Sequence, residues 1–570
     1  MTIERYRIGD LLVDTATGTV ARGDRRLHLP PLSFALLVAV LRRAPDVIKR
    51  DELIDEVWNG DLVSDETLSQ RVRMLRESLE DGSGSPRYLA TVRGWGYRAG
   101  LPVEREGGGA ASSTTVAVLP FANLGGRPED EPLCQGLAEE IINALAHVNG
   151  LQVIARTSST AVSRLGLDVR EAGRRLSAGS IVEGSVRRSG DRVRVTVQLG
   201  ETAGGGHLWS DRYDRELRDV FELEDEIAEA VARRLRSDLA SGGLRRRRRP
   251  ANPAAYEAYL QGRHHFNGVG GPEGMTRAAA CLERSVELDP GFAPAFDALA
   301  ELHWYLGFFG AVAPRDAFGQ SVWYALRALE LDEGLADTHA LLAMLKKELD
   351  YDWAEVDREV ARARELDPDS PIVRVRAAVS ALLPHGRLEE ALAEIDVALS
   401  RDPLSMFVRW WSGAIAYLAR QPERVLDEGR RMVVLEPANP LGQWVLGMGH
   451  ALAGEVEDAL VRMSDAVRFS GEAPFFAGFL ALAQGHGGHA VEARAILDRL
   501  LAAAEGRYVQ PFAIALAHIG LGEWDEAFRW MNSAVEQRDP LVIPVKSFVF
   551  LDPVRDDPRF LSVLKAMNLS

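Results

Sequence analysis

The C-terminal half of the chain repeats one short segment, which is GRLEEA at 386–391, GEVEDA at 454–459, GHAVEA at 488–493 and GEWDEA at 522–527. The opening glycines are separated by 68, 34 and 34 residues, so the period is 34. Prolines after helical segments recur in phase with them: Pro290, Pro368, Pro403 and Pro437. A fixed period of this length predicts a stack of similar units around one continuous core.

Alanines recur where the helices of such a unit would cross. They occupy two repeat positions seven residues apart: Ala391, Ala459, Ala493 and Ala527, then Ala363, Ala398, Ala466 and Ala534. The pattern resembles the tetratricopeptide repeat, a helix–turn–helix unit of 34 residues with small residues at its crossings. The resemblance implies an all-α solenoid whose concave face binds a protein or peptide. Residues 293–335 exceed one period and lack the closing proline, so we expect an irregular second repeat.

Length and composition predict several folded domains. The 570 residues exceed the usual ~100–200 of one domain, and 46% apolar with 26% charged residues is typical of globular proteins. Glycine-rich or arginine-rich stretches at 106–109, 241–243 and 245–250 read as linkers. We therefore expect domains at 1–102, 113–240 and 254–570, the last being the repeat array with a C-terminal cap.

The sequence shows no sign of membrane insertion, export or thiol chemistry. Its longest apolar runs are far shorter than the ~18–20 residues that span a bilayer, and no apolar signal core follows Met1. The two cysteines, Cys134 and Cys281, have no thiol neighbour in sequence, which argues against a disulfide framework or a thiolate zinc site. We expect a cytoplasmic protein that does not contact membranes.

The net charge of −16 disfavours DNA binding by the chain as a whole. Residues 1–100, however, carry 15 Lys and Arg against 15 Asp and Glu, so this segment is neutral within an acidic chain. A DNA-binding function therefore has to depend on a local basic surface.

The first 100 residues predict a small sheet, three helices and a hairpin. Residues 6–13 and 17–20 alternate as strands, and helices are expected at 30–42, at 51–58 and from Ser64 to Leu79. In the third helix Leu68, Val72, Leu75 and Leu79 share one side. Gln70, Arg73 and Met74 face away from that side, with Arg71 and Arg76 flanking them. Arginine and glutamine can read base edges in the major groove, and flanking arginines suit phosphates.

The pair SDETLSQRVRMLRESL (64–79) and TVRGWGYR (91–98) resembles the winged-helix effector domain of the OmpR/PhoB type, which is also CadC-like. The resemblance implies that Thr67, Arg71, Arg76 and Arg93 hold phosphates, that Gln70, Arg73 and Met74 face bases, and that Thr91 lies at the base of the wing. It also implies that the loop Asn59, Gly60, Asp61, Leu62 and Val63 contacts RNA polymerase. Glu66 and Met74 depart from the basic residues often found at their positions, so the family's base preference does not transfer.

The middle segment predicts a small α/β domain. Val116–Phe121 and Gln152–Ala155 read as strands, Leu133–His147 as an amphipathic helix and Ser180–Gly200 as a hairpin. Together with VAVLPFANL and LWSDRYDREL, these elements resemble the TolB-N-terminal-like domain. No phosphate loop or nucleophile elbow is present, and the histidines at 264–265, 486 and 489 are interpreted as structural. We therefore expect no enzyme activity, cofactor or metal.

Two functions are compatible with this sequence, and a third, an enzyme accessory, rests on the resemblance of the middle segment to segments attached to class III adenylate cyclases, whose catalytic domain has no counterpart here. In the first, the protein is a transcriptional regulator whose winged helix binds double-stranded promoter DNA and whose array binds a protein or other effector. In the second, the protein is a tetratricopeptide scaffold that uses the winged helix for protein contacts. Arg71, Arg73, Arg76 and Arg93 favour the first, because a scaffold has no need for them on one face. The operator, the signal, the sign of regulation, the oligomeric state and the role of the middle domain do not follow from the sequence.

Overall fold

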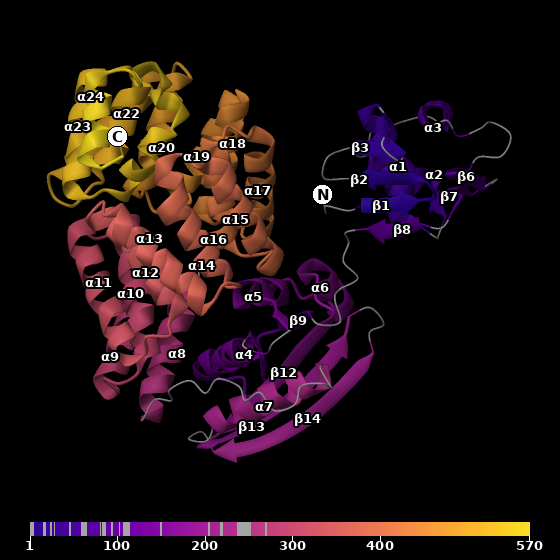
Figure 1. The fold of residues 1–570 in the computed structure, drawn as a ribbon, viewed down its shortest axis with the longest axis horizontal. Coiled ribbons are helices and arrows are strands. Elements are labelled where there is room, and N and C mark those ends of the chain that lie inside the picture. Colours follow the sequence, from indigo (N-terminus) through magenta and orange to yellow (C-terminus); the bar gives the residue numbers. More distant parts are fainter. Residues whose placement is uncertain are drawn as a thin grey trace. The chain divides into compact units, whose positions relative to one another are not determined.

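The computed structural model divides into two compact units, Met1–Ser112 and Ser113–Ser570 (Figure 1). The residues that it describes are 5–14, 19–22, 25–27, 29–44, 47–58, 65–79, 81, 87–92, 95–101, 103–106, 115–146, 148, 151–202, 206–216, 220–235, 252–267 and 271–569. By compactness the predicted middle and repeat domains belong to one unit, and their division at 240–254 stays a prediction.

The first unit begins with a five-stranded antiparallel sheet in the order β4-β3-β2-β1-β8. Its strands are β1 (Arg5–Ile8), β2 (Leu11–Asp14), β3 (Thr19–Arg22), β4 (Arg25–Leu27) and β8 (Val103–Glu106). Tyr6, Ile8, Leu11 and Val13 are all fully buried. The predicted N-terminal sheet is confirmed, and it supports the helices that follow.

Three helices and a second sheet complete this unit. The helices are α1 (Pro31–Arg43), α2 (Arg50–Trp58) and α3 (Asp65–Ser78), and the strands are β5 (Ile48–Lys49), β6 (Leu89–Val92) and β7 (Gly96–Ala99). The second sheet has the order β5-β7-β6, in which β6 and β7 form the predicted hairpin. The sequence-predicted winged helix is therefore confirmed element by element.

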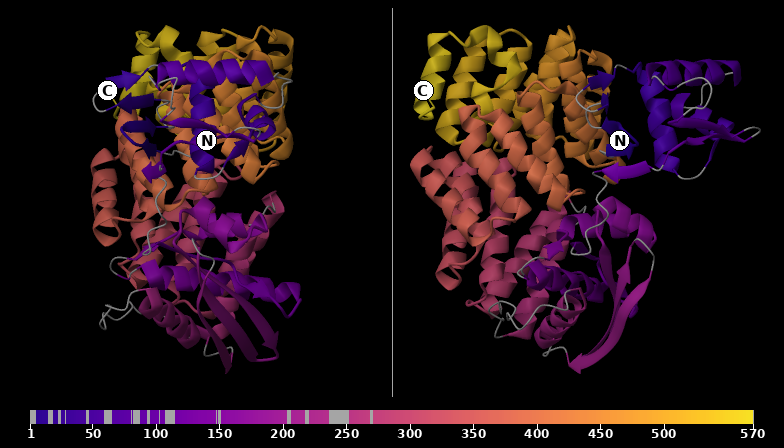
Figure 2. Two further views of the ribbon diagram at one scale, coloured as in Figure 1. Left: turned by 90° about the vertical axis from the view of Figure 1, so that its right-hand side faces the viewer. Right: turned by 45° about the vertical axis from the view of Figure 1, so that its right-hand side comes forward.

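The second unit opens with a six-stranded mixed sheet in the order β11-β9-β12-β13-β14, with β10 also paired to β12. Its strands are β9 (Thr115–Val118), β10 (Ala122–Asn123), β11 (Gln152–Val153), β12 (Ser180–Ser189), β13 (Arg192–Glu201) and β14 (His207–Glu216). The three long strands β12, β13 and β14 form a curved antiparallel layer (Figures 1 and 2). The α/β prediction is confirmed, and β14 is a strand that the sequence analysis did not assign.

Four helices and one short turn pack with this sheet. They are η1 (Pro128–Asp130), α4 (Glu131–Ala146), α5 (Arg156–Arg164), α6 (Val169–Leu176) and α7 (Val220–Leu235). Apolar residues of α4 and α7 share one cluster with β12 and β13, and this cluster also contains Tyr256, Tyr259 and Leu260 of the first array helix. The sheet domain and the array therefore share a core.

A buried carboxylate adds a polar tie between the same two parts. Asp402, 1% exposed, accepts hydrogen bonds from the hydroxyls of Thr157 and Ser158 and from the Ser158 backbone N–H at 3.2 Å. The Ser158 hydroxyl in turn accepts from the backbone N–H of Leu404 at 2.7 Å. These contacts join the first turn of α5 to the turn that closes one repeat.

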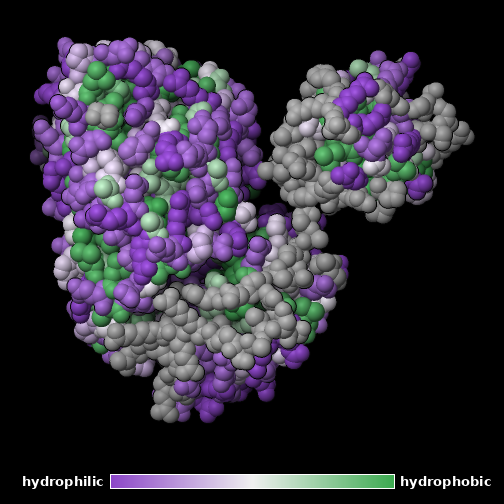
Figure 3. Space-filling view, in the orientation of Figure 1, coloured by the Kyte–Doolittle hydropathy of each residue, from purple (hydrophilic) through white to green (hydrophobic). Residues whose placement is uncertain are grey.

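The array is a stack of helix pairs, as the 34-residue period predicts. The pairs are α8 (Pro253–Asn267) with α9 (Gly271–Leu288), α10 (Ala293–Phe308) with α11 (Pro314–Leu331), α12 (Ala336–Leu349) with α13 (Trp353–Leu366), α14 (Pro371–Ala377) with α15 (Leu388–Arg401), α16 (Met406–Leu418) with α17 (Pro422–Leu435), α18 (Pro440–Ala453) with α19 (Val456–Phe469), α20 (Pro474–His486) with α21 (Ala490–Ala504), and α22 (Pro511–Gly520) with α23 (Trp524–Gln537). The face of the array in Figure 3 is mainly hydrophilic with scattered apolar patches, because the apolar side chains lie between the helices.

The alanines of the repeat lie at the predicted helix crossings. All eight are at most 1% exposed: Ala363, Ala391, Ala398, Ala459, Ala466, Ala493, Ala527 and Ala534. The predicted irregularity at 293–335 comes from α11, which has 18 residues, where most second helices have 14. A second irregularity was not predicted: α14 continues into a π-helix η3 (Ala378–Leu382) and a 3-10 turn η4 (Leu383–His385).

In four of the pairs, the repeat glycine follows the first helix and has a left-handed conformation. Gly386, Gly454, Gly488 and Gly522 have φ of 74°, 81°, 84° and 73°. The 68-residue gap between the first two is explained by Arg420, which lies 34 residues after Gly386 and has φ 58°. A non-glycine residue in this region costs roughly 1–2 kcal/mol.

We expect Arg420→Gly to raise the melting temperature of the full chain, because it removes this backbone strain. The Arg420 guanidinium is 2.7 Å from the Asp552 carboxylate, but such an exposed pair contributes at most about 1 kcal/mol. Asp552→Asn measures the loss of the pair alone. Gly454→Ala should have the opposite effect and lower the melting temperature. If both substitutions shift the melting temperature in the same direction, Arg420 does not carry the backbone strain assigned to it.

The chain after the last helix pair folds back onto the early repeats. It forms η5 (Pro540–Lys546), η6 (Val549–Val554) and α24 (Pro558–Ala566), the cap predicted at the C-terminus. The Trp353 indole donates to the carbonyl of Met567 at 3.1 Å, and the Asn568 amide donates to that of Tyr351 at 3.2 Å. Figure 1 shows α23 and α24, in yellow, directly above the region of α11 to α13. The C-terminal segment therefore packs against the connection between α12 and α13.

Candidate nucleic-acid interface

Helix α3 presents the side chains that the sequence analysis assigned to DNA. Leu68, Val72, Leu75 and Leu79 are at most 3% exposed, which fixes the rotation of the helix against the core of its unit. The opposite side exposes Thr67, Gln70, Arg73 and Met74, whereas Arg71 and Arg76 are half-buried. The predicted separation of an apolar and a polar face is confirmed.

Arg73 is the most accessible cation of this face. Its side chain is 81% exposed, and its Nε lies 2.9 Å from a carboxylate oxygen of Glu77, one turn further along the helix. An exposed pair of this kind contributes about 0–1 kcal/mol. The guanidinium can therefore exchange Glu77 for a base edge or a phosphate at little cost.

Arg76 connects α3 to the wing, which is the hairpin formed by β6 and β7. Its guanidinium donates to the carbonyl of Leu89 at 2.8 Å and to the hydroxyl of Thr91 at 2.8 Å. Two residues that the sequence assigned separately to DNA are thus hydrogen-bonded to each other. Arg76 therefore fixes the start of the wing relative to α3.

Asp81 anchors β6, the first strand of the wing, and the sequence analysis did not predict this role. It is 6% exposed, and its carboxylate accepts hydrogen bonds from the backbone N–H groups of Arg87, Tyr88 and Leu89. Three donors on one carboxylate hold the beginning of β6 in place. No local pattern in the sequence signals this role, because the carboxylate binds backbone groups six to eight residues further along the chain.

A further contact joins the wing to the N-terminal sheet. The Tyr88 hydroxyl donates to the Asp10 carboxylate, and this hydrogen bond lowers the pKa of Asp10. Burial of the phenol raises the pKa of Tyr88. Asp10 also lies 3.5 Å from the Arg22 guanidinium and 3.6 Å from that of Arg87.

The wing exposes one large aromatic side chain that the sequence analysis left without a role. Trp95, in the turn between β6 and β7, is 66% exposed, and Arg98 on β7 is also exposed. Gly96 lets β7 approach β5, because a Cβ at this position would lie 2.0 Å from the carbonyl oxygen of Ile48. Arg93, the capping residue Ser64 and the loop Asn59–Val63 lie outside the described residues.

Histidines in the second unit do not form a convincing metal site. His264 Nδ1 lies 3.0 Å from the Gln135 amide oxygen, which places it in the contact between the sheet domain and the array. Within the described ranges, His450, Glu455 and Asp458 bring ligand atoms within 4.8 Å of one another, but both carboxylates are exposed at a repeat turn. His450 already pairs with Glu455 at 2.6 Å.

None of the helices in the described residues combines the length and the apolar character that crossing a bilayer requires.

Known proteins resemble the chain in different parts. Residues 24–99 match the family described as transcriptional regulatory protein, C terminal. A putative adenylate cyclase 3 of Rhizobium meliloti is 36% identical over 237 residues, which cover 40% of each protein. The transcriptional regulator HilA of Salmonella typhimurium is 25% identical over 395 residues, 68% of each protein. The transcriptional activator CadC of Escherichia coli is 39% identical over 98 residues, 17% of this chain and 19% of CadC.

The family match covers the helices α1 to α3 and the hairpin β6–β7, which are the elements that build the candidate interface. The alignments with HilA and CadC connect the chain to transcriptional regulators. The N-terminal domain of this chain is an OmpR/PhoB-type DNA-binding domain of transcriptional regulatory proteins, and it precedes a sheet domain and a tetratricopeptide-like array.

Proposed function

We propose that this protein is a transcriptional regulator without catalytic activity, which binds promoter DNA through its first unit and an effector through its array. The observation that carries the proposal is the geometry of α3 and the wing. Gln70 and Arg73 are exposed on one helix face, and Arg76 hydrogen-bonds that helix to the wing. A winged helix needs such a fixed angle if helix and wing are to contact one duplex together.

The individual roles follow the resemblance. Gln70, Arg73 and Met74 are assigned to base edges, and Thr67, Arg71, Arg76 and Arg93 to phosphates, with Thr91 at the base of the wing. We add Trp95 as a residue that contacts DNA, because its ring is exposed at the tip of the wing. The loop Asn59–Val63 is assigned to RNA polymerase.

The absence of catalysis is proposed from the relatives. HilA and CadC are named as regulators, whereas the protein named as an adenylate cyclase aligns over only 40% of its length. We place the protein in the cytoplasm, where promoter DNA and RNA polymerase are found. A protein or peptide partner of the array remains part of the proposal.

We expect the full chain to retain a subset of genomic promoter fragments, with an affinity that falls steeply as salt rises. Phosphate contacts by arginines release condensed counterions, so log K should decrease linearly with log salt. Electrophoretic mobility shifts at several salt concentrations measure the slope. As a matched control, Arg277→Ala removes an exposed arginine that pairs with Glu273 one turn away in α9, and it should leave the slope unchanged.

A flat salt response with no fragment retained would contradict DNA binding and favour the scaffold alternative. A steep slope without any preference among fragments would leave the protein a nonspecific DNA binder and contradict the assignment of bases to Gln70 and Arg73.

A further inference from the structure

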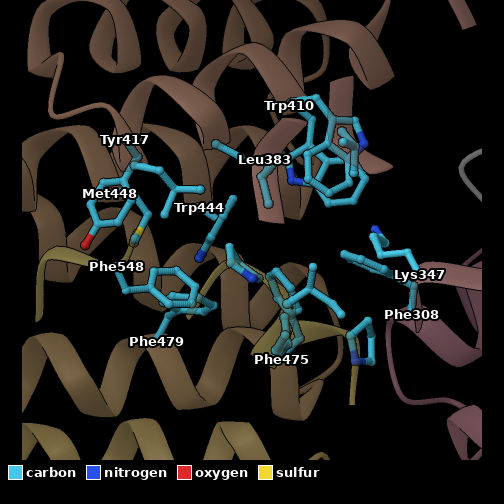
Figure 4. A pocket seen from close by; sticks show the side chains of 18 residues that line it. Phe308, Lys347, Leu383, Trp410, Tyr417, Trp444, Met448, Phe475, Phe479 and Phe548 are labelled. Atoms are coloured by element: carbon cyan, nitrogen blue, oxygen red, sulfur yellow. The ribbon is translucent and has the colours of Figure 1, made fainter. Parts of the chain in front are cut away.

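The inner side of the array contains a cavity. Its walls come from the first helix of several pairs, α10, α12, α16, α18 and α20, and from η5 of the C-terminal segment. Figure 4 shows aromatic rings around one space, with Lys347 at one end and Tyr417 and Met448 at the other. The cavity is separate from the DNA-binding domain and lies within the second unit.

Aromatic side chains build most of the wall. The ring centroids of Phe308 and Trp410 are 5.4 Å apart, and those of Trp444 and Phe475 are also 5.4 Å apart. Trp411 and Phe479 extend the same cluster. Rings held at these distances fix one another, so the wall offers preformed apolar contact to a ligand.

One cation lines this apolar space. Lys347 is 2% exposed, and its Nζ lies 3.3 Å from one oxygen of the buried Glu348 carboxylate. The other oxygen of Glu348 accepts a hydrogen bond from the Trp304 indole at 3.0 Å. An ammonium group has three N–H donors, so Glu348 cannot satisfy all of them. Burial lowers the pKa of Lys347, because the charged form loses its hydration.

Three indoles of the wall also need acceptors. The Nε1 atoms of Trp410, Trp411 and Trp444 are buried and have no hydrogen-bond partner in the part of the chain that the structure describes. A buried donor without a partner is destabilising, and native proteins leave few of them. Three indole N–H groups in this wall therefore lack an acceptor.

We propose that the cavity binds a small carboxylic acid with an apolar body. The carboxylate would accept hydrogen bonds from Lys347 and from the indole N–H groups, and the body would contact the rings of Phe308, Phe475 and Phe479. The cavity volume that the centre of a water-sized sphere can occupy is about 60 Å³, whereas a single water molecule needs ~10–15 Å³ by the same measure. This size favours a short-chain or single-ring acid.

A cationic ligand is the main competitor, because aromatic cages bind ammonium groups. The position of Lys347 disfavours it, since two cations in one apolar cavity repel each other. The site identifies the chemical class of the array's effector as an apolar carboxylic acid. Only an effect of this acid on DNA affinity rests on the proposed function. Binding itself is independent of that function.

The test uses the full chain and measures binding by tryptophan fluorescence and calorimetry. The probes are butanoate, hexanoate, octanoate and phenylacetate, their amides as neutral counterparts, and tetramethylammonium as the cation. We expect saturable binding of at least one acid, about tenfold or more tighter than its amide, because a charged acceptor strengthens each hydrogen bond.

The variants test whether the preference for an acid depends on the charge of Lys347 or only on an intact cavity. Lys347→Met combined with Glu348→Gln removes both members of the buried pair, so no lone charge is left inside. This double variant should lose the preference for acid over amide while it keeps amide binding. Lys346→Met is the matched control, since Lys346 is the preceding residue and pairs with Asp350 outside the cavity. Trp444→Phe keeps a ring and removes one N–H, and it should weaken acid binding more than amide binding.

Three results would overturn the site: no saturable binding of any acid at millimolar concentration, equal affinity for acids and amides, or binding of tetramethylammonium in place of the acids. DNA binding is measured in parallel on the same preparations. Acid binding without DNA binding would contradict the proposed function and leave the site intact, and the reverse result would contradict the site alone.

Discussion

Replacing Asp402 with alanine is expected to destabilise the contact between the sheet domain and the array by about 3 kcal/mol or more. The substitution removes the shared acceptor of the Ser158 backbone N–H and of two hydroxyls in a buried position. Each buried donor left without a partner costs about 1–3 kcal/mol. Hydrogen exchange should become faster at the start of α5, and the urea midpoint of the full chain should fall.

The matched control is Asp367→Ala. Asp367 lies 35 residues earlier, before the proline of the preceding repeat, but its carboxylate accepts only from the backbone N–H groups of Asp369 and Ser370 in its own turn. This variant should lose about 1 kcal/mol and leave the exchange of α5 unchanged. If the two variants have the same effect on α5, the bond network of Asp402 does not hold the sheet domain to the array.

Arg73→Ala and Arg76→Ala are expected to affect DNA binding in different ways. Arg73 is exposed and forms an ion pair with Glu77, so its loss should cost about 1–3 kcal/mol of binding and relax preference at one base position. Arg76 is hydrogen-bonded to Leu89 and Thr91, so its loss should weaken binding to all sequences. It should also lower the thermal stability of the first unit, which Arg73→Ala leaves unchanged.

Binding to a library of operator variants separates the two effects, and melting curves supply the second readout. Arg76→Lys keeps the charge but lacks the fork that spans a carbonyl and a hydroxyl, so it should restore little of the wing's stability. Identical sequence profiles for Arg73→Ala and Arg76→Ala would show that the assignment of faces on α3 is wrong.

The regular elements were predictable from the sequence because their signals are local or periodic. The phase of Leu68, Val72 and Leu75 fixed which side of α3 is exposed, and the glycine and alanine spacing fixed the period of the array. Where the period lacked its glycine, Arg420 kept the left-handed turn, because the surrounding helix pairs determine that conformation. The candidate DNA-reading residues follow from helix phase alone, which explains why exposed Gln70 and Arg73 were found.

The remaining features depend on contacts between distant parts of the chain. Arg76 reaches Thr91 across the turn between α3 and the wing, and Asp402 reaches Ser158 over 244 residues. The cavity exists because Pro540–Lys546 folds back against helices that begin near residue 293. No local pattern encodes such pairings, since the same arginine or aspartate would be equally compatible with solvent. The sequence by itself determined the winged helix, the repeat and the polar face of α3; the tertiary structure decided which of these polar groups hold the protein together, because burial and hydrogen-bond partners arise only when distant segments meet.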